Sequence, residues 1–156
     1  MSDTYSQIYI QCVFAVSKRE CLLLPEWRTN LFEYIAGIIR TKGQKSIIVG
    51  GYLDHVHVFV GLKPQMAISD LIRDVKNSST NFINENKYVK GKFSWQTGFG
   101  AFSYSQSQIG NVYDYILNQE KHHKKKSFRD EYLDFLKKFE IEYNEKYLFN
   151  WIETKE

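Results

Sequence analysis

His55 and His57 are the two residues whose type and spacing point most directly to chemistry. They lie two positions apart in the β-branched run Asp54-His55-Val56-His57-Val58-Phe59-Val60. Successive side chains of a strand point to opposite faces, so the two imidazoles share one face and the valines occupy the other, which belongs to a core. Two imidazoles on one face suggest a metal site, and a structural histidine pair is the alternative.

A metal site needs at least one further ligand. Later in the chain, Gln119, Glu120, His122 and His123 offer nitrogen or oxygen donors. A glutamine amide oxygen can complete a mixed shell around Mg²⁺ or Mn²⁺, and His122 and His123 stay open as alternatives to it. Asp54 is expected on the other side of the strand, where it would support a ligand from behind.

Tyr115 and Gln119 are four residues apart, which places them one turn apart on one helical face. A phenol has a pKa of about 10 and is a poor nucleophile unless its target is polarised or its proton is removed. A divalent cation that grips a phosphodiester provides that polarisation. Taken by itself the helix favours a plain packing role for Tyr115, and Tyr113 competes for the nucleophile role, although no amide follows it four residues later.

The elements that must position these residues follow from periodicity. Alternation predicts a first strand over residues 5–16, whose second face carries Tyr9 and Gln11, and a hairpin over residues 46–62 that turns at Gly50-Gly51. Helical spacing, with Pro25 at the start and Gly43 at the end, predicts a helix between them. A second helix starts at residue 68, a strand covers residues 99–104, and a third helix covers residues 106–125.

Ser127 and Asp130 resemble a capping box, so another helix is expected there, with an apolar side formed by Phe128, Leu133, Leu136 and Phe139. The order of strands and helices predicts an α+β, ferredoxin-like sandwich with a mostly antiparallel sheet. Two helices would cover one sheet face. The other face, with the histidines, would stay open for a site or for the tyrosine-bearing helix.

Composition sets the broad class. The 156 residues suit a single domain, 1–156, and a hydrophobic content of 43% with 25% charged residues is ordinary for a soluble protein. A net charge of +3 permits a nucleic-acid partner without requiring one. Two cysteines, Cys12 and Cys21, are interpreted as reduced thiols. With no apolar run of membrane-spanning length and no signal peptide, a cytoplasmic location without a membrane is expected.

These motifs together resemble the single-tyrosine HUH transposases of small bacterial insertion sequences and their close relatives associated with repetitive extragenic palindromes. His55-Val56-His57 is similar to the histidine–hydrophobic–histidine motif, and Tyr115-Ile-Leu-Asn-Gln119 to the tyrosine helix. The likeness also takes in Ser69-Asp70-Leu71-Ile72 and the segment from Trp95 to Ser103.

The resemblance implies a metal-dependent, single-stranded DNA endonuclease and transposase. His55, His57 and Gln119 would be the metal ligands and Tyr115 the nucleophile, which forms a 5′-phosphotyrosine link and frees a 3′-hydroxyl. The partners would be single-stranded DNA with a hairpin and a second copy in a homodimer, in which the tyrosine helix can serve its own or the partner's histidines. The candidate DNA-backbone contacts are Arg73, Lys76, Asn77, Lys121, Lys124 and Lys125.

Three other functions stay open. A domesticated relative would cleave genomic palindromes with the same chemistry. A non-catalytic nucleic-acid-binding module would keep the fold without activity. A metal hydrolase that activates water would cleave without a covalent intermediate.

Overall fold

A four-stranded antiparallel sheet organises the chain, and the computed structural model describes residues 3–152 of it. The spatial order is β2-β3-β1-β4, with β1 in the middle against β3 and β4. With α1 between β1 and β2 and α2 between β3 and β4, this is the predicted ferredoxin-like topology. The strands are β1 Tyr9–Ala15, β2 Lys45–Gly51, β3 His55–Gly61 and β4 Gly100–Tyr104.

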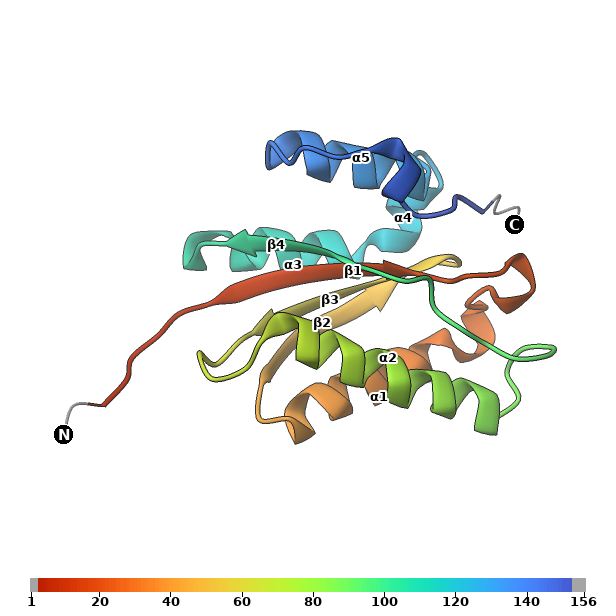
Figure 1. Cartoon of the computed structure of the whole chain (residues 1–156), viewed down its shortest axis with the longest axis horizontal. Helices are drawn as coiled ribbons and strands as arrows, with labels where there is room; N and C mark the ends of the chain where they lie inside the picture. Colours follow the sequence, from red (N-terminus) through yellow and green to blue (C-terminus); the bar gives the residue numbers. More distant parts are fainter. Residues whose placement is uncertain (1–2, 153–156) are drawn as a thin grey trace.

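Helices α1 (Pro25–Thr41) and α2 (Ile68–Glu85) pack on one face of the sheet (Figure 1). The valines that alternate with the two histidines point into this layer, as the strand pattern predicts. Pro25 occupies the first turn of α1, and Gly43, with a φ of 78°, follows its end. Burial of this apolar layer fixes which face of β3 is left for His55 and His57.

The other sheet face is covered in part by the tyrosine-bearing helix, one of the two outcomes expected from the sequence, and α5 adds a second cover that was not expected. Helix α3 (Ile109–Leu117) lies over the β2–β3 side, where Val112 and Ile116 pack on Phe59 (Figure 1). Helix α5 (Phe128–Lys138) and the residues around Phe149 cover the β1–β4 side. Helices close both sides because each carries its own apolar stripe, which must be buried against the sheet.

The expected helix over residues 106–125 is divided. A 3₁₀ turn (Gln106–Gln108) leads into α3, and α3 ends at Leu117. Asn118, with a ψ of 22°, separates it from the short helix α4 (Gln119–His123). Tyr115 and Gln119 therefore belong to different helices, and their proximity comes from how the break orients α4.

The β2–β3 turn also differs from the expectation. Gly50 and Gly51 end β2 and pair with β3, so the chain reverses at Tyr52–Asp54 instead. At Gly50 a Cβ atom would lie 2.8 Å from Ile116 Cγ2 and 2.9 Å from the Ile116 carbonyl oxygen. The glycine is needed because α3 crosses β2 at close range there.

Helix α5 and the tail that follows it form the cover on the β1–β4 side. Ser127 caps α5 by accepting a hydrogen bond from the Asp130 backbone N–H at 3.1 Å, as the capping-box pattern predicts. On its predicted apolar side, Phe128 and Leu136 are buried and Leu133 and Phe139 are half-buried. The buried stripe also takes in Tyr132 and Phe135, which were not predicted. Within residues 3–152, no helix is long and apolar enough to cross a membrane.

Candidate active site

His55 and His57 lie side by side on β3, fully buried, with ring centroids 5.0 Å apart. A hydrogen bond at the Nδ1 atom fixes the orientation of each ring. His55 Nδ1 donates to Asp54 Oδ1 at 2.7 Å, and His57 Nδ1 accepts from Gln11 Nε2 at 2.8 Å. These contacts leave the two Nε2 atoms directed toward the same region above the sheet. Second-layer partners of this kind fix the rings that bind metals in proteins.

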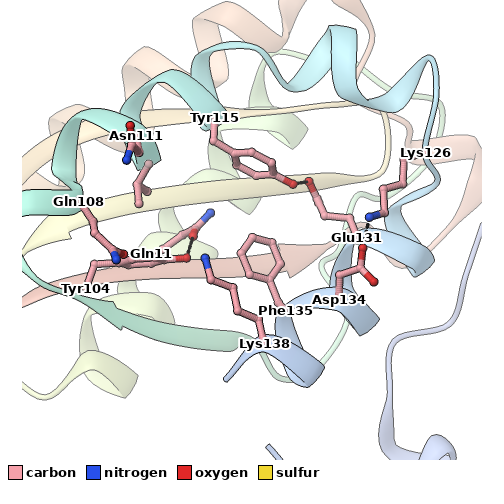
Figure 2. Close-up of a pocket in the computed structure, with 11 residues that line it drawn as sticks. Gln11, Tyr104, Gln108, Asn111, Tyr115, Lys126, Glu131, Asp134, Phe135 and Lys138 are labelled. Carbon is pink, nitrogen blue, oxygen red and sulfur yellow. Dashed lines mark hydrogen bonds and ion pairs between the residues drawn. The ribbon is translucent and has the colours of Figure 1, made fainter. Parts of the chain in front are cut away.

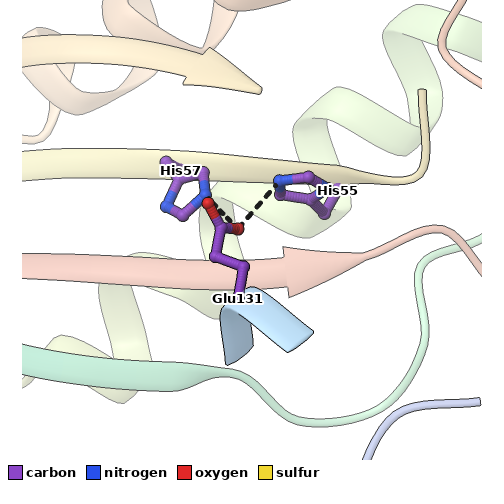
Figure 3. A group of neighbouring side chains, drawn as sticks. All are labelled: His55, His57 and Glu131. Carbon is purple, nitrogen blue, oxygen red and sulfur yellow. Dashed lines mark hydrogen bonds and ion pairs between the residues drawn. The ribbon is translucent and has the colours of Figure 1, made fainter. Parts of the chain in front are cut away.

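Glu131 of α5 enters this region, although it was not among the candidate residues selected from the sequence. Its Oε1 lies 3.0 Å from His57 Nε2 and 3.3 Å from His55 Nε2. Figure 3 shows the carboxylate reaching from α5 to both imidazoles on β3. Glu131 is only 3% exposed, so its charge is separated from solvent and depends on these partners.

The other carboxylate oxygen of Glu131 faces the predicted nucleophile and the predicted ligand. Tyr115 donates a short hydrogen bond from its hydroxyl to Glu131 Oε2, and Gln119 Nε2 donates to the same oxygen at 2.9 Å. Gln119 Oε1 in turn lies 2.8 Å from His55 Nε2. The structure thus brings all four motif side chains together around one carboxylate.

His122 and His123, the alternative metal ligands, lie in different places. His123 Nε2 lies 3.0 Å from Gln119 Oε1 and 3.3 Å from Glu131 Oε2, so it borders the cluster. His122 is exposed and packs its ring on Tyr115 at a centroid distance of 4.5 Å. Glu120 is exposed, and its Oε1 lies 3.7 Å from Arg28 Nη2 in an ion pair. Tyr113 is 40% exposed, whereas Tyr115 is half-buried against His57.

Burial and charge shift the ionisation of the cluster in opposite directions. Burial alone would lower the pKa of His55, but hydrogen bonds to Asp54 and Glu131 raise it to about 10. Burial is the main cause of a lowered pKa at His57. Burial would raise the pKa of Glu131, yet the three surrounding imidazoles hold it well below its usual range. Without a bound cation, the carboxylate is charged and its charge is balanced by histidine.

Tyr115 is protonated in this arrangement. Burial, followed by the negative charge of Glu131, raises the pKa of its phenol well above the usual value. The phenol therefore needs a change in its surroundings before it becomes a nucleophile.

The donor set fits a divalent cation. One ligand atom from each of His55, His57 and Glu131 lies within 4.8 Å of the others, and all three residues are buried. Two imidazole nitrogens and a carboxylate oxygen suit Mn²⁺ or a similar metal, with the Gln119 amide oxygen beside them. The geometry is thus that of a potential metal centre next to a tyrosine hydroxyl.

The residues expected to contact the DNA backbone occupy two separate places. Arg73, Lys76 and Asn77 belong to α2, in the layer on the opposite side of the sheet from Tyr115. Arg73 pairs with Asp70 and Asp74, and Lys76 Nζ donates to the Gln96 and Gly98 carbonyl oxygens at 2.9 and 2.6 Å. Three exposed lysines lie on or just after α4, on the side of the candidate site: Lys121, Lys124 and Lys125.

The chain belongs to the IS200-like transposase family. The family model described as "Transposase IS200 like" matches residues 4–119, three quarters of the chain. That span includes both histidines, Tyr115 and Gln119, and it stops before Glu131. Family membership supports a transposase role, and with it an enzyme that cuts DNA and takes part in DNA recombination.

Solved structures share the fold. A chain from Deinococcus radiodurans R1, described as a candidate transposase, has a TM-score of 0.61 and 20% identity over 76% of this chain and 95% of its own. The REP-associated tyrosine transposase bound to a REP hairpin has a TM-score of 0.55 and 17% identity, covering 79% of this chain and 74% of its own. Among curated proteins, none matches this sequence.

Glu131 is the site residue that sequence reasoning missed. A signal for it exists: it lies three residues after Phe128 and four before Phe135, so it falls on the buried stripe of α5. A single carboxylate within an apolar helical stripe indicates a buried partner or a metal. The predicted stripe consisted of Phe128, Leu133, Leu136 and Phe139. It left out Tyr132 and Phe135, the buried neighbours that place Glu131 on the buried side of the helix.

Proposed function

We propose that this protein cleaves and rejoins single-stranded DNA through Tyr115, using a divalent cation such as Mg²⁺ or Mn²⁺. The observation that carries the proposal is the contact between the Tyr115 hydroxyl and a carboxylate that also faces both histidines. A nucleophile, a proton acceptor and a set of metal ligands thus meet at one point. Family membership and the hairpin-bound structural neighbour support DNA with a hairpin as the substrate.

The cation would be held by His55 Nε2, His57 Nε2 and Glu131 Oε1, with Gln119 Oε1 beside them. When bound, such an ion supplies polarisation of the scissile phosphate and stabilises its developing charge. Asp54 and Gln11 keep the two imidazoles in place from their other nitrogen atoms. This set extends the ligands expected from the sequence by one residue, Glu131.

The chain's own residues account for the proton. Tyr115 Oη attacks the phosphorus and forms a P–O bond, while the bond from phosphorus to the 3′ oxygen breaks. The phenolic proton leaves through Glu131 Oε2, which already accepts the hydrogen bond from it and, because the pKa of this carboxyl is held low, passes the proton on to water. The leaving 3′ oxygen takes up a proton from water and becomes a hydroxyl. The reverse attack, by a 3′-hydroxyl on the phosphotyrosine, joins strands without an external energy source.

One chain supplies every residue of the proposed site, because Tyr115 lies against the histidines of its own sheet. This contact supports a reaction in which the tyrosine helix serves the histidines of its own chain. Homodimerisation, which the family resemblance implies, stays a prediction, and so does the distinction between a mobile element's enzyme and a domesticated relative.

The test uses hairpin oligonucleotides with randomised single-stranded flanks, labelled at either end and incubated with Mg²⁺ or Mn²⁺. We expect wild-type protein to give a covalent adduct that survives denaturing gels, and chelator to abolish it. Tyr115→Phe should remove the adduct completely, whereas Tyr113→Phe, an exposed tyrosine on the same helix, should retain it. Cleavage without an adduct would favour a water-activating hydrolase, and binding without cleavage a non-catalytic module.

A further inference from the structure

A cavity of about 430 Å³ opens beside Tyr115. Its lining side chains come from β1, β4, α5 and the start of α3, and Tyr115 and Glu131 form one end of it (Figure 2). The cavity is thus continuous with the proposed catalytic centre. Whatever binds here lies within reach of the phosphate that Tyr115 would attack.

Aromatic rings border the cavity. Tyr104 from β4 and Phe135 from α5 both line it, on either side of Gln11 from β1. Aromatic faces are the surfaces on which unpaired bases stack in proteins that bind single strands. Tyr104 also donates to Gln11 Oε1 at 2.9 Å, and Gln11 holds His57. A base stacked here would therefore rest on a side chain that is connected to the metal-ligand pair.

Two amide side chains line the cavity from the first turn of α3 and the turn before it. Gln108 and Asn111 are three residues apart, and both are exposed. Within residues 3–152, neither side chain makes a hydrogen bond to the protein, which leaves both amides free for a ligand. Glutamine and asparagine amides offer a donor and an acceptor together, the pattern that a base edge presents.

The charges around the cavity suit a nucleotide. Asp134 is paired with Lys126, and Glu131 is surrounded by histidines. Lys138 lies with its Nζ 5.7 Å from the Tyr104 ring centroid, and in the described part of the chain it has no carboxylate partner. An unpaired lysine at the edge of an aromatic pocket is placed to meet a phosphate.

We propose that this cavity binds one unpaired nucleotide next to the scissile phosphate. The base packs against Tyr104 beside Phe135, its edge bonds to Gln108 and Asn111, and Lys138 faces its phosphate. The inference rests on the proposed function, since it places the strand that Tyr115 cleaves. It adds a source of sequence preference at one position, supplied by the protein itself.

The test measures binding, so that it does not depend on cleavage. Full-length protein carrying Tyr115→Phe is titrated with fluorescent single-stranded homopolymers of dA, dC, dG or dT, about ten nucleotides long, at one fixed salt concentration. We expect one base to bind roughly tenfold more tightly than the others. Gln108→Leu and Asn111→Leu should each reduce that preference to about twofold or less, with a smaller effect on the weakest homopolymer.

Gln65→Leu is the matched control: it makes the same change at an exposed amide in the β3–α2 connection, far along the chain from the cavity. It should leave the preference intact. Equal binding of all four homopolymers, or a preference that survives both Gln108→Leu and Asn111→Leu, would overturn the inference. Unchanged circular dichroism of the variants separates a lost contact from a lost fold.

The outcome is distinguishable from failure of the proposed function. If wild-type protein never forms a covalent adduct but the base preference depends on Gln108 and Asn111, the cleavage proposal fails and the nucleotide pocket stands. If adducts form normally in both leucine variants and an abasic site at any position beside the cleavage point leaves the rate unchanged, the pocket inference fails and the cleavage proposal stands.

Discussion

At the scale of single residues, Glu131 defines the site. Its two oxygens face different partners: Oε1 faces both histidines of β3, and Oε2 faces Tyr115 and Gln119. One carboxylate therefore connects the proposed ligands to the proposed nucleophile. This division would let the same side chain hold a cation through one oxygen and receive the phenolic proton through the other.

Glu131→Gln should weaken both the fold and the cation site. The substitution keeps the size of the side chain and removes the charge that balances the buried imidazoles. With metal ions removed by a chelator, we expect the free energy of unfolding to fall by about 2 kcal/mol, the typical loss for a buried hydrogen bond to a charged group. The affinity for Mn²⁺, measured from the rise in melting temperature on titration, should fall at least roughly tenfold.

Asp134→Asn is the control for this substitution. Asp134 lies one turn further along α5, is exposed and pairs with Lys126. Its loss should change unfolding by no more than about 0.5 kcal/mol and leave Mn²⁺ binding as in the wild type. Equal Mn²⁺ affinities for wild type and Glu131→Gln would exclude Glu131 as a ligand.

At the scale of elements, the contact between β2 and α3 positions Tyr115. Gly50 pairs with His57 across the sheet and lies under Ile116, the residue after Tyr115. A strand glycine here lets the helix backbone approach closely enough for the hydroxyl to reach Glu131. The distance between the layers is thus controlled by a residue that takes no part in the chemistry.

Gly50→Ala should separate α3 from the sheet. Its Cβ would meet both a side-chain carbon and the carbonyl oxygen of Ile116 below 3.0 Å, so the helix must shift. We expect a stability loss of about 1–3 kcal/mol, measured by urea denaturation. Adduct formation should fall at least roughly tenfold in protein that remains folded, because the nucleophile is displaced.

Gly37→Ala makes the same change in α1, where nothing lies within 4 Å of the new Cβ. Since alanine favours a helix interior over glycine by about 1 kcal/mol, this variant should be more stable and fully active. If the two alanine variants lose adduct formation equally, the close contact at Gly50 does not position Tyr115.

At the scale of the whole molecule, closure of the second sheet face withdraws tyrosines from solvent: Tyr132 is buried and Tyr104 is half-buried. Burial raises the pKa of Tyr104 and of Tyr132 from 10 to about 12. Between pH 10 and pH 12 these two phenols are deprotonated in the unfolded chain but still protonated in the folded chain. Because the folded state then binds more protons, stability must fall as the pH rises.

We therefore expect the free energy of unfolding to be unaffected by these groups below pH 10 and to decline from pH 10 to 12. Urea denaturation across this range, with tyrosinate absorbance followed in parallel, measures the decline. Tyr132→Phe should make it shallower, whereas Tyr147→Phe, a tyrosine 78% exposed, should leave it unchanged. A decline of the same steepness in Tyr132→Phe would contradict this origin.

Local sequence patterns were enough to predict most of the framework. Alternation along β1 and β3 assigned the correct faces, so the pattern alone separates His55 and His57 from Val56 and Val58. The start of α1 at Pro25 and the cap of α5 at Ser127 were predicted from the sequence in the same way. These features depend on neighbours within a few residues, and for that reason the sequence displays them directly.

Features that depend on packing between distant elements could not be predicted from local sequence patterns. The break at Asn118, the turn after Gly51 and the closing of the second sheet face all follow from how α3, α4 and α5 fit the sheet. In each case the local pattern allowed more than one solution. Tertiary contacts selected among them.

The sequence by itself determined the histidine strand, the tyrosine four residues before an amide, and the family to which they point. Only the tertiary structure decided that a carboxylate 74 residues after His57 completes the cluster. The physical reason is that periodicity encodes which side of an element is buried, but not what it is buried against. That partner is set when α5 docks on the sheet and brings Glu131 between the imidazoles and Tyr115.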